Sequence, residues 1–195
     1  MGSKLAAPLA LFAVATLLQR PRFCACVRDE DLRLSFTKSG IVTDVIPKVP
    51  KRLAAVTYPA GASVQLGNTL TPEQAADVPD VRVPGDPYRW YTVILLDPDA
   101  PSRKDPKMRH WLHWLVVNVP QPETTTLTKY AGPTPPHGTG EHRYVFLVYK
   151  QQRMVTRNGL KGFGKERAKF NLTAFLEAAE MDELVAANYF VAENK

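Results

Sequence analysis

Three long apolar runs dominate the pattern of hydrophobic and polar positions along the chain. Residues 91–96, 111–119 and 143–149 are rich in β-branched and aromatic side chains, and each run starts or stops beside Asp, Pro or Gly. Continuous runs of this length and composition are typical of central β-strands that are covered on both faces. The pattern therefore predicts a buried sheet built around three strands.

Shorter patterns predict strands at the periphery. Residues 54–58 and 64–68 are candidate strands, the second with a turn at its end, and residues 186–190 are expected to form the last strand. Prolines interrupt residues 78–87. Because proline has no backbone N–H to donate, this segment is expected to be a loop or an edge strand.

Helical patterns are scarce. Residues 172–187 form the one convincing amphipathic segment, which predicts a helix near the C-terminus. A short helix is also expected at Thr71–Glu73, because Thr71 suits the cap position and Pro72 suits the first turn. Together the elements predict a β-sandwich or sheet core with a few peripheral helices.

Composition is consistent with one β-rich domain. The chain has 195 residues, of which 45% are hydrophobic, and 17 prolines against 11 glycines favour ordered loops over a helical bundle. The formal net charge is +6, but three of the positive charges lie in the first 26 residues, which contain no acid, so the remainder carries +3. This mild charge argues against a nucleic-acid partner.

The N-terminal segment has the layout of a secretory signal peptide. Lys4 precedes an apolar run over residues 5–18, and two arginines follow the run, which is too short for a comfortable transmembrane helix. We therefore expect residues 1–26 to be a signal peptide and residues 27–195 to form the domain of a secreted protein, with at most peripheral membrane contact. A mitochondrial presequence is the alternative, because the segment contains arginines and no acid.

The cysteines and one glycosylation sequon bear on whether the chain is exported. The only cysteines, Cys24 and Cys26, precede the expected domain, which therefore needs no disulfide framework. Asn171, Leu172 and Thr173 form a sequon, so Asn171 is a candidate N-glycosylation site in a secreted protein.

Polar residues that a buried strand should not leave unpaired mark three segments. Asp97 directly follows the first apolar run, so its carboxylate must find donors or face a cavity. The alternative is a loop cap, because Asp97–Asp99 is good turn sequence. His113 lies inside the second run, where a regular strand would place it on one face with Trp111 and Leu115. A histidine with such neighbours is more often a satisfied core residue than a ligand.

The third segment, residues 135–144, contains Gly138 and Gly140, which allow backbone amides to turn toward an anion. His142 and Tyr144 then share a face at the start of the third run. Taken together, two histidines, a carboxylate and a tyrosine hydroxyl predict a small anion pocket. An imidazolium beside a carboxylate would pair with a phosphate there.

Other chemistries find less support. His110 and His113 are three residues apart, which in a strand places them on opposite faces, so no metal site is expected. The chain has no G-x-S-x-G elbow and no cysteine nucleophile in the expected domain. A weak hydrolase that uses His142 and Asp97 remains an alternative.

Two long motifs resemble the signatures of the phosphatidylethanolamine-binding proteins, whose members include the Raf kinase inhibitor protein and the plant flowering regulators. The first motif is DPDAPSRKDP at residues 97–106, which leads into WLHWLVVN at 111–118, and the second is PPHGTGEHRY at 135–144. Shorter matches upstream occur in the same order and spacing, so the resemblance spans about residues 44–190.

The resemblance implies two antiparallel β-sheets in a sandwich, with a pocket at one edge for phosphate, phosphoethanolamine or acetate. It also implies a non-catalytic protein without a cofactor that acts as a ligand-gated binding or inhibitory partner of kinases, proteases or transcription factors. Pro101, Pro136 and Gly138 would shape the rim. By motif position, the pocket role carries onto Asp97, Trp111, His113, Pro135, His142 and Tyr144.

Two positions depart from the family pattern. Thr134 stands where the family usually has a glycine. The family's chain also continues into a C-terminal helix beside the pocket, whereas this sequence stops at Lys195, so we expect the domain to lack that helix and the pocket mouth to be more open. The expected function is binding of a phosphatidylethanolamine or phosphate headgroup; the first alternative is a secreted inhibitor of a protease or kinase that acts through protein–protein contact.

Overall fold

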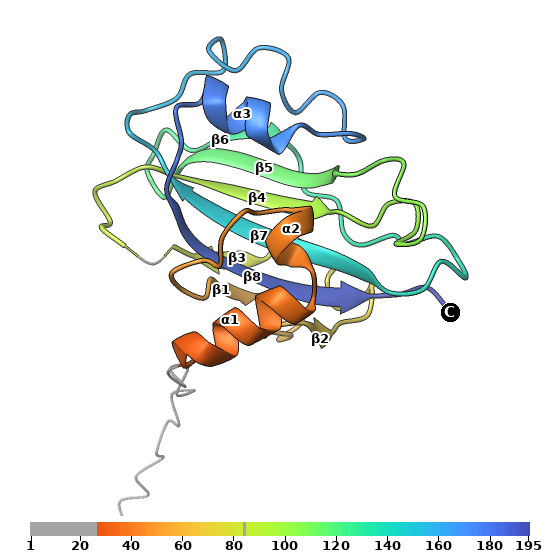
Figure 1. Ribbon diagram of the computed structural model, residues 1–195. Helices are drawn as coiled ribbons and strands as arrows, with labels where there is room; N and C mark the ends of the chain where they lie inside the picture. Colours follow the sequence, from red (N-terminus) through yellow and green to blue (C-terminus); the bar gives the residue numbers. More distant parts are fainter. Residues whose placement is uncertain (1–26, 84) are drawn as a thin grey trace, which may run out of the picture.

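A six-stranded sheet forms the centre of the computed structural model, which describes residues 27–83 and 85–195 (Figure 1). The signal peptide predicted for residues 1–26 lies outside the described residues. In spatial order the strands are β2 (Asn68–Thr69), β8 (Leu184–Ala192), β7 (His142–Lys150), β4 (Tyr91–Asp97), β5 (Trp111–Val119) and β6 (Thr125–Thr128). Neighbouring strands pair antiparallel, except β2 and β8, which pair parallel.

The three strands predicted from long apolar runs are confirmed as β4, β5 and β7, which lie side by side in the sheet. All seven residues of β4 are buried, and only Lys150 of β7 is not. Since a strand covered on both faces has no solvent side, its sequence lacks the alternation of a half-exposed strand. This explains why continuous runs, and not alternating ones, mark the centre of the sheet.

A second, smaller sheet consists of β1 (Ala55–Thr57) and β3 (Asp80–Arg82), which pair antiparallel. β1 confirms the strand predicted at residues 54–58, and β3 lies within the proline-rich segment predicted as loop or edge strand. The strand predicted at residues 64–68 is wrong except at its last residue, where β2 begins. Leu66 and Gly67 have φ angles of 46° and 94°, so the chain turns there instead of extending. The expected mainly β fold with two sheets is confirmed.

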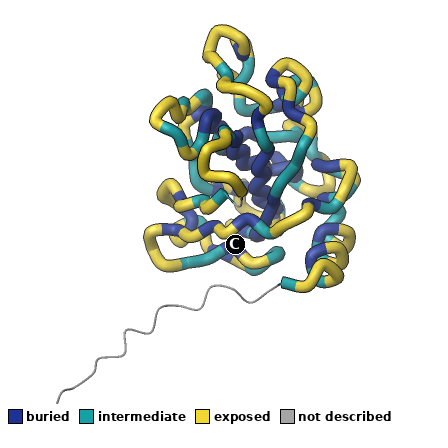
Figure 2. Tube along the Cα trace, turned by 90° about the vertical axis from the view of Figure 1, so that its left-hand side faces the viewer, coloured by how far each residue is buried: buried dark blue, intermediate teal, exposed yellow. Residues whose placement is uncertain are grey.

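Three helices cover one face of the large sheet, and the small sheet covers the other (Figures 1 and 2). They are α1 (Asp29–Lys38), α2 (Ile41–Asp44) and α3 (Leu172–Ala178). On the helical side of the core, Phe36 of α1 and Phe175 of α3 pack in one cluster with residues of the central strands, Ile94 and Leu147 among them. Among the described residues, no helix is both long and apolar enough to cross a membrane.

The helix predicted over residues 172–187 is wrong beyond its first half. α3 ends at Ala178, Glu180 has a φ of 53°, and the chain then enters β8 at Leu184. Ala186 and Ala187 are fully buried and pair with Val148 and Leu147 of β7. Their apolar character therefore comes from strand packing on both faces and not from a helical stripe.

The expected short helix at Thr71–Glu73 is a turn. The Thr71 hydroxyl accepts from the Gln74 N–H at 3.3 Å, and the Gln74 side chain accepts from the Thr71 N–H at 2.9 Å. This reciprocal pattern is a capping box, yet no α-helix follows it. Conversely, α1 was not predicted: two of its ten residues are buried, so it has little apolar stripe.

Arg143, near the start of β7, joins parts of the chain that are distant in sequence. Its side chain is almost fully buried, and its Nε and Nη2 donate to the two carboxylate oxygens of Asp99 at 2.8 and 2.6 Å. Nη1 donates to the Ser39 carbonyl at 2.7 Å, and Nη2 also reaches Asp44 Oδ2 at 2.7 Å. One guanidinium thus ties the loop after β4 and the helices α1 and α2 to the central sheet.

The charge of Asp99 depends on that guanidinium. Burial alone would raise the pKa of Asp99, but the hydrogen bonds and positive charge of Arg143 outweigh burial and hold the pKa below its usual range. The ion pair is therefore intact over the physiological pH range.

We expect the Arg143→Met variant to lose ~3–5 kcal/mol in free energy of unfolding, because the buried Asp99 carboxylate loses its bidentate guanidinium and keeps only the backbone N–H of residue 143 at 2.9 Å and the more distant Arg109 at 3.8 Å. Urea titration followed by circular dichroism measures the loss. The matched control is Arg153→Met, which removes an exposed ion pair with Glu180 and should change stability by less than ~1 kcal/mol. Equal stabilities for the two variants would contradict this account.

His110, which immediately precedes β5, should make stability depend on pH. Its Nδ1 is shielded from solvent and has no hydrogen-bond partner among the described residues. Burial first, and the charge of Arg109 second, lower the pKa of His110 from 6.5 to about 4. The unfolded chain therefore takes up this proton at a higher pH than the folded chain does, so stability is full above pH 6.5 and falls as the pH drops toward 4.

We expect the free energy of unfolding to decrease by at most ~1.4 kcal/mol per pH unit in that window because of His110. Urea titrations at a series of pH values should show a shallower slope for His110→Gln than for the wild type. His137→Gln is the control, since His137 is exposed and its replacement should leave the slope unchanged. Identical slopes for His110→Gln and the wild type would rule out the assignment.

Candidate functional site

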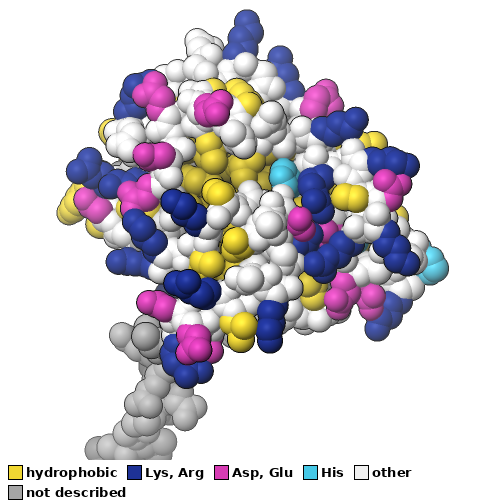
Figure 3. All heavy atoms as spheres, viewed as in Figure 1, with side chains coloured by type: hydrophobic (Ala, Val, Ile, Leu, Met, Phe, Trp, Pro, Cys, Tyr) yellow, Lys and Arg dark blue, Asp and Glu magenta, His cyan; other side chains and the backbone are white. Residues whose placement is uncertain are grey.

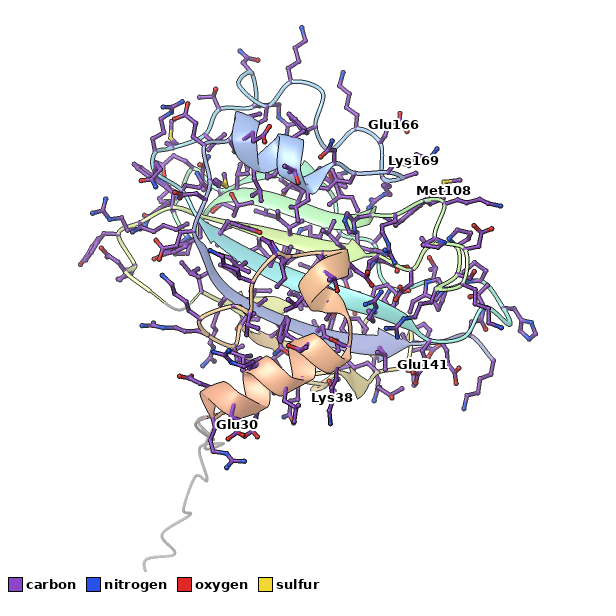
Figure 4. All side chains as sticks on the ribbon, viewed as in Figure 1. Glu30, Lys38, Met108, Glu141, Glu166 and Lys169 are labelled. Carbon is purple, nitrogen blue, oxygen red and sulfur yellow. The ribbon has the colours of Figure 1, made fainter. Side chains whose placement is uncertain are left out.

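A small cavity of about 130 Å³ opens at the end of the large sheet where β4 ends and β7 begins. Met108 and Glu141, which are labelled in Figure 4, lie at this end of the molecule. The residues that line the cavity are Asp97, Ala100, Pro101, Met108, Trp111, His113, Thr134, Pro136, His142 and Tyr144.

Seven of the nine residues predicted for ligand binding line this cavity, and two do not. Pro135 is buried and does not line the cavity. Gly138 has a φ of 73°, as expected for a turn, but its N–H donates to the Asn194 carbonyl at 3.2 Å. The expectation that the Gly138 amide faces an anion is therefore wrong.

Three lining residues were missed. Ala100 and Met108 carry no polar group, and nothing in their local sequence distinguishes them from other loop residues. Thr134 precedes the second motif and is exposed at the cavity. In the sequence it differs from the family pattern, which usually has a glycine at this position. Its place directly before the motif at residues 135–144 is the one sequence feature that indicates a position near the site.

The centre of the site is a buried pair between β4 and β7. The Nδ1 atom of His142 lies 2.8 Å from Asp97 Oδ2, and both side chains are at most 4% exposed. Asp97 Oδ1 accepts from the Asp99 N–H at 2.6 Å. The carboxylate thus serves both as the predicted partner of the histidine and as the loop cap that was the alternative explanation.

The other ring nitrogen of His142 is also engaged. Its Nε2 lies 3.0 Å from the Thr139 hydroxyl, which itself donates to the Pro136 carbonyl at 2.7 Å. Because a hydroxyl has one proton, Thr139 must accept from His142 Nε2–H. Both nitrogens of His142 therefore lie against oxygen atoms, Asp97 Oδ2 and Thr139 Oγ1, so the ring has no free nitrogen for a further partner.

His113 reaches the cavity because of a β-bulge. Leu95 pairs with Trp114 and Leu96 with Leu112, so His113 is an extra residue in β5. The predicted shared face for His113 and Leu115 is therefore wrong. Leu115 packs in the helical side of the core, whereas the His113 ring contacts the edge of Tyr144 at a centroid distance of 5.1 Å.

The His113 ring is held in one orientation. Its Nδ1 lies 2.8 Å from the Ala131 carbonyl, which can only accept, so Nδ1 carries the proton. Burial is the main reason that the pKa of His113 lies below its usual range, which keeps the ring neutral near pH 7. Burial and then the charge of Asp97 raise the pKa of Tyr144, so that phenol keeps its proton as a donor.

The arrangement favours binding over nucleophilic catalysis. Thr139, His142 and Asp97 follow the order of a nucleophile, a base and an orienting carboxylate. The Thr139 proton, however, goes to Pro136, and His142 Nε2 already carries a proton, so the ring cannot act as the base in this state. Within residues 27–83 and 85–195, no three His, Cys, Asp or Glu side chains gather as a metal site requires.

A wider groove of about 1060 Å³ lies on the helical face, between α3 and residues 45–51. Figure 3 shows apolar side chains gathered in this hollow. Two of its charged lining residues, Lys51 and Glu183, form an ion pair with each other at 3.0 Å. The small cavity instead combines buried His and Asp side chains, so it is the better candidate for a polar ligand.

The other predicted position, Asn171, is exposed at the start of α3. Its side-chain oxygen accepts from the Ala174 N–H at 3.0 Å and caps the helix. Its glycosylation stays a prediction.

The comparisons with known proteins agree with the two motifs. A 26 kDa secreted antigen of Toxocara canis is 38% identical over 161 residues, which cover 80% of this chain and 62% of that protein. The chain thus spans less than two thirds of that relative's length.

Solved structures give the same result. The carboxypeptidase Y inhibitor, in complex with its cognate proteinase, is 30% identical with a TM-score of 0.77, over 88% of this chain and 98% of the inhibitor. The phosphatidylethanolamine-binding protein from Plasmodium vivax is 25% identical with a TM-score of 0.69, over 83% and 97%. The family model described as phosphatidylethanolamine-binding protein matches residues 60–190. The chain therefore belongs to the phosphatidylethanolamine-binding protein family.

Proposed function

We propose that this protein binds a small phosphate-bearing anion, such as the phosphoethanolamine headgroup, in the cavity at the end of β4 and β7. The observation that carries the proposal is the buried Asp97–His142 pair, which meets His113 and Tyr144 in a single small cavity. Perturbed titratable groups that converge in a pocket are typical of ligand sites. The family description names the same class of ligand.

The cavity suits one small polar group. Its volume of about 130 Å³ leaves room for a phosphate but not for an acyl chain. The Tyr144 hydroxyl is available to donate to a phosphate oxygen, whereas both ring nitrogens of His142 are engaged by Asp97 and Thr139, so His142 holds the Asp97 carboxylate beside the ligand. Trp111, Pro101 and Pro136 give the cavity apolar walls that limit the access of water, which strengthens the polar contacts.

We further propose that the protein acts without catalytic turnover and without a cofactor, and that it is exported. Support for export comes from the signal-peptide pattern of residues 1–26 and from the relative named as a secreted antigen. Export would also make the sequon at Asn171 accessible to glycosylation.

Binding of phosphorylethanolamine can be measured by titration calorimetry. We expect saturable binding by the full chain and a loss of about 10- to 100-fold in affinity for His142→Ala, because the variant leaves the Asp97 carboxylate beside the anion without its hydrogen bond to the ring, a bond to a charged group that contributes ~1.5–3 kcal/mol. His137→Ala is the control, since His137 belongs to the same loop but is exposed and outside the cavity. Absence of binding by the folded wild type, or equal affinities for all three proteins, would refute the proposal.

A second candidate function is inhibition of a peptidase. The observation that favours it is the similarity to the carboxypeptidase Y inhibitor, over almost the whole length of that protein. A kinase is the alternative target for an inhibitor of this kind. Inhibition of this kind would act through the protein surface and not through the small cavity.

The two candidates differ in how they respond to a change in the cavity. If the protein is a peptidase inhibitor, the full chain should inhibit carboxypeptidase Y at a fixed ratio of protein to enzyme, and His142→Ala should inhibit equally well. A steady-state assay with a chromogenic peptide measures both. Absence of inhibition at a large molar excess of the wild type would remove this candidate.

A further inference from the structure

The wide groove on the helical face is separate from the small cavity. Its volume of about 1060 Å³ is slightly above the ~300–1,000 Å³ that is typical of sites for small molecules. Tyr149 lines the groove near the end of β7, whereas His142 lines the small cavity at the start of the same strand. At ~3.3 Å per residue of strand, these two positions are about 23 Å apart. One small ligand therefore cannot occupy both sites.

The floor of the groove is apolar. Among the residues that line it, Val45, Leu172 and Met181 are buried. Leu176 of α3 is half-buried and continues this apolar surface toward solvent. Figure 3 shows apolar side chains gathered in the hollow. A concave apolar surface that is open to solvent is typical of a site that receives an apolar ligand.

Tyr149 is the polar member of the buried lining residues, and its hydroxyl has no hydrogen-bond partner within residues 27–83 and 85–195. The residue is only 4% exposed, and burial raises its pKa to about 12, so the phenol keeps its proton. In the same ranges, the unpartnered side-chain atoms that are also shielded from solvent are Trp90 Nε1 and His110 Nδ1. The Tyr149 oxygen is not among them, so it touches the open space of the groove. A buried donor without an acceptor is costly unless a ligand supplies one.

The charged residues that line the groove disfavour an anionic ligand. All of them are exposed or half-exposed, and four carboxylates outnumber two lysines: Glu177, Glu180, Asp182, Glu183, Lys48 and Lys51. Lys51 is already paired with Glu183 at 3.0 Å. Among the described residues that line the groove, no buried one is lysine or arginine. An ionised carboxylate would therefore lose hydration on the apolar floor without gaining a buried cation.

We propose that the groove binds an uncharged, elongated apolar molecule, such as a long-chain ketone or ester, whose one polar oxygen accepts a hydrogen bond from the Tyr149 hydroxyl. The carbon chain lies between α3 and residues 45–51, on the apolar floor. The two features of the ligand answer two features of the groove, because the floor needs an apolar cover and the phenol needs an acceptor. This second site is independent of the anion site at the other end of β7.

Binding can be measured with Nile red, an uncharged dye whose fluorescence rises in apolar surroundings. Methyl decyl ketone should displace the dye from the full-length chain, and each methylene removed from the ketone should weaken binding by up to about fourfold. Dodecanoate has the same number of carbons but carries a charge, so it should bind at least about tenfold more weakly. Absence of dye binding by the folded chain, or equal affinities for the ketone and dodecanoate, would overturn the proposal.

The Leu176→Gln variant tests the location of the ligand. The amide replaces part of the apolar surface on α3, so the affinity for methyl decyl ketone should fall about tenfold. Leu34→Gln is the matched control, because Leu34 is 49% exposed on α1 and does not line the groove. Circular dichroism checks that both variants are folded. Equal affinities for the two folded variants would place the ligand elsewhere and contradict the proposal.

The Tyr149→Phe variant tests the hydrogen bond. It keeps the ring and removes only the hydroxyl, so the ketone should bind ~2- to 10-fold more weakly, as the loss of a hydrogen bond between neutral groups predicts. Tyr88→Phe makes the same change at a residue that is 86% exposed, and it should bind as the wild type does. Unchanged affinity in Tyr149→Phe would refute the part assigned to the phenol and the need for a polar oxygen in the ligand.

A second copy of the chain could cover the groove instead of a small molecule. Sedimentation velocity at the concentrations of the dye titration should show a monomer. A dimer that Leu176→Gln dissociates would assign the groove to self-association and overturn the proposal. Excess phosphorylethanolamine should leave Nile red bound, because the anion site is at the opposite end of β7. Displacement of the dye would place it in the small cavity, whereas failure of phosphorylethanolamine itself to bind would count only against the anion site.

Discussion

The buried ion pair between Arg143 and Asp99 is the interaction on which the rest of the structure depends. Consecutive residues of a strand point to opposite faces, so His142 and Arg143 separate at the start of β7. Arg143 turns to the helical side, where it holds Asp99, Asp44 and the Ser39 carbonyl. His142 turns to the cavity and meets Asp97. Each basic residue thus has its own carboxylate, two positions apart in the loop that follows β4.

This arrangement couples the scaffold to the site. The guanidinium fixes the loop that follows β4, and this adds to the two short hydrogen bonds that hold the Asp97 carboxylate in the cavity. Because Arg143 also bonds to the connection between α1 and α2, the helical layer contributes to the order of the cavity on the opposite side of the sheet. Groups with a second layer of support of this kind are held close to one geometry, which a small polar ligand requires.

The sequence alone predicted the central sheet and most of the site, for a physical reason. Long apolar runs leave few alternatives to buried strands, and a polar residue at the end of such a run, like Asp97, must be paired or functional. The resemblance to the family then added Trp111 and Pro101, whose role no local pattern indicates. Local patterns failed where tertiary contacts decide. Helix α3 stops early because Ala186 and Ala187 are needed in the sheet, and the bulge at His113 depends on pairing with Leu95 and Leu96.

The bulge in β5 also bears on how such a site arises and disappears. His113 is one residue more than the ladder between β4 and β5 requires, and its neighbours Leu112 and Trp114 already have partners. Deletion of His113 alone would remove the register shift between Leu95 and Leu96 and would take the imidazole out of the cavity. The sheet and the proposed binding site are therefore separable by one in-frame deletion. A relative could therefore lose the pocket and keep the sheet. We expect relatives without this extra residue among proteins that act through their surfaces.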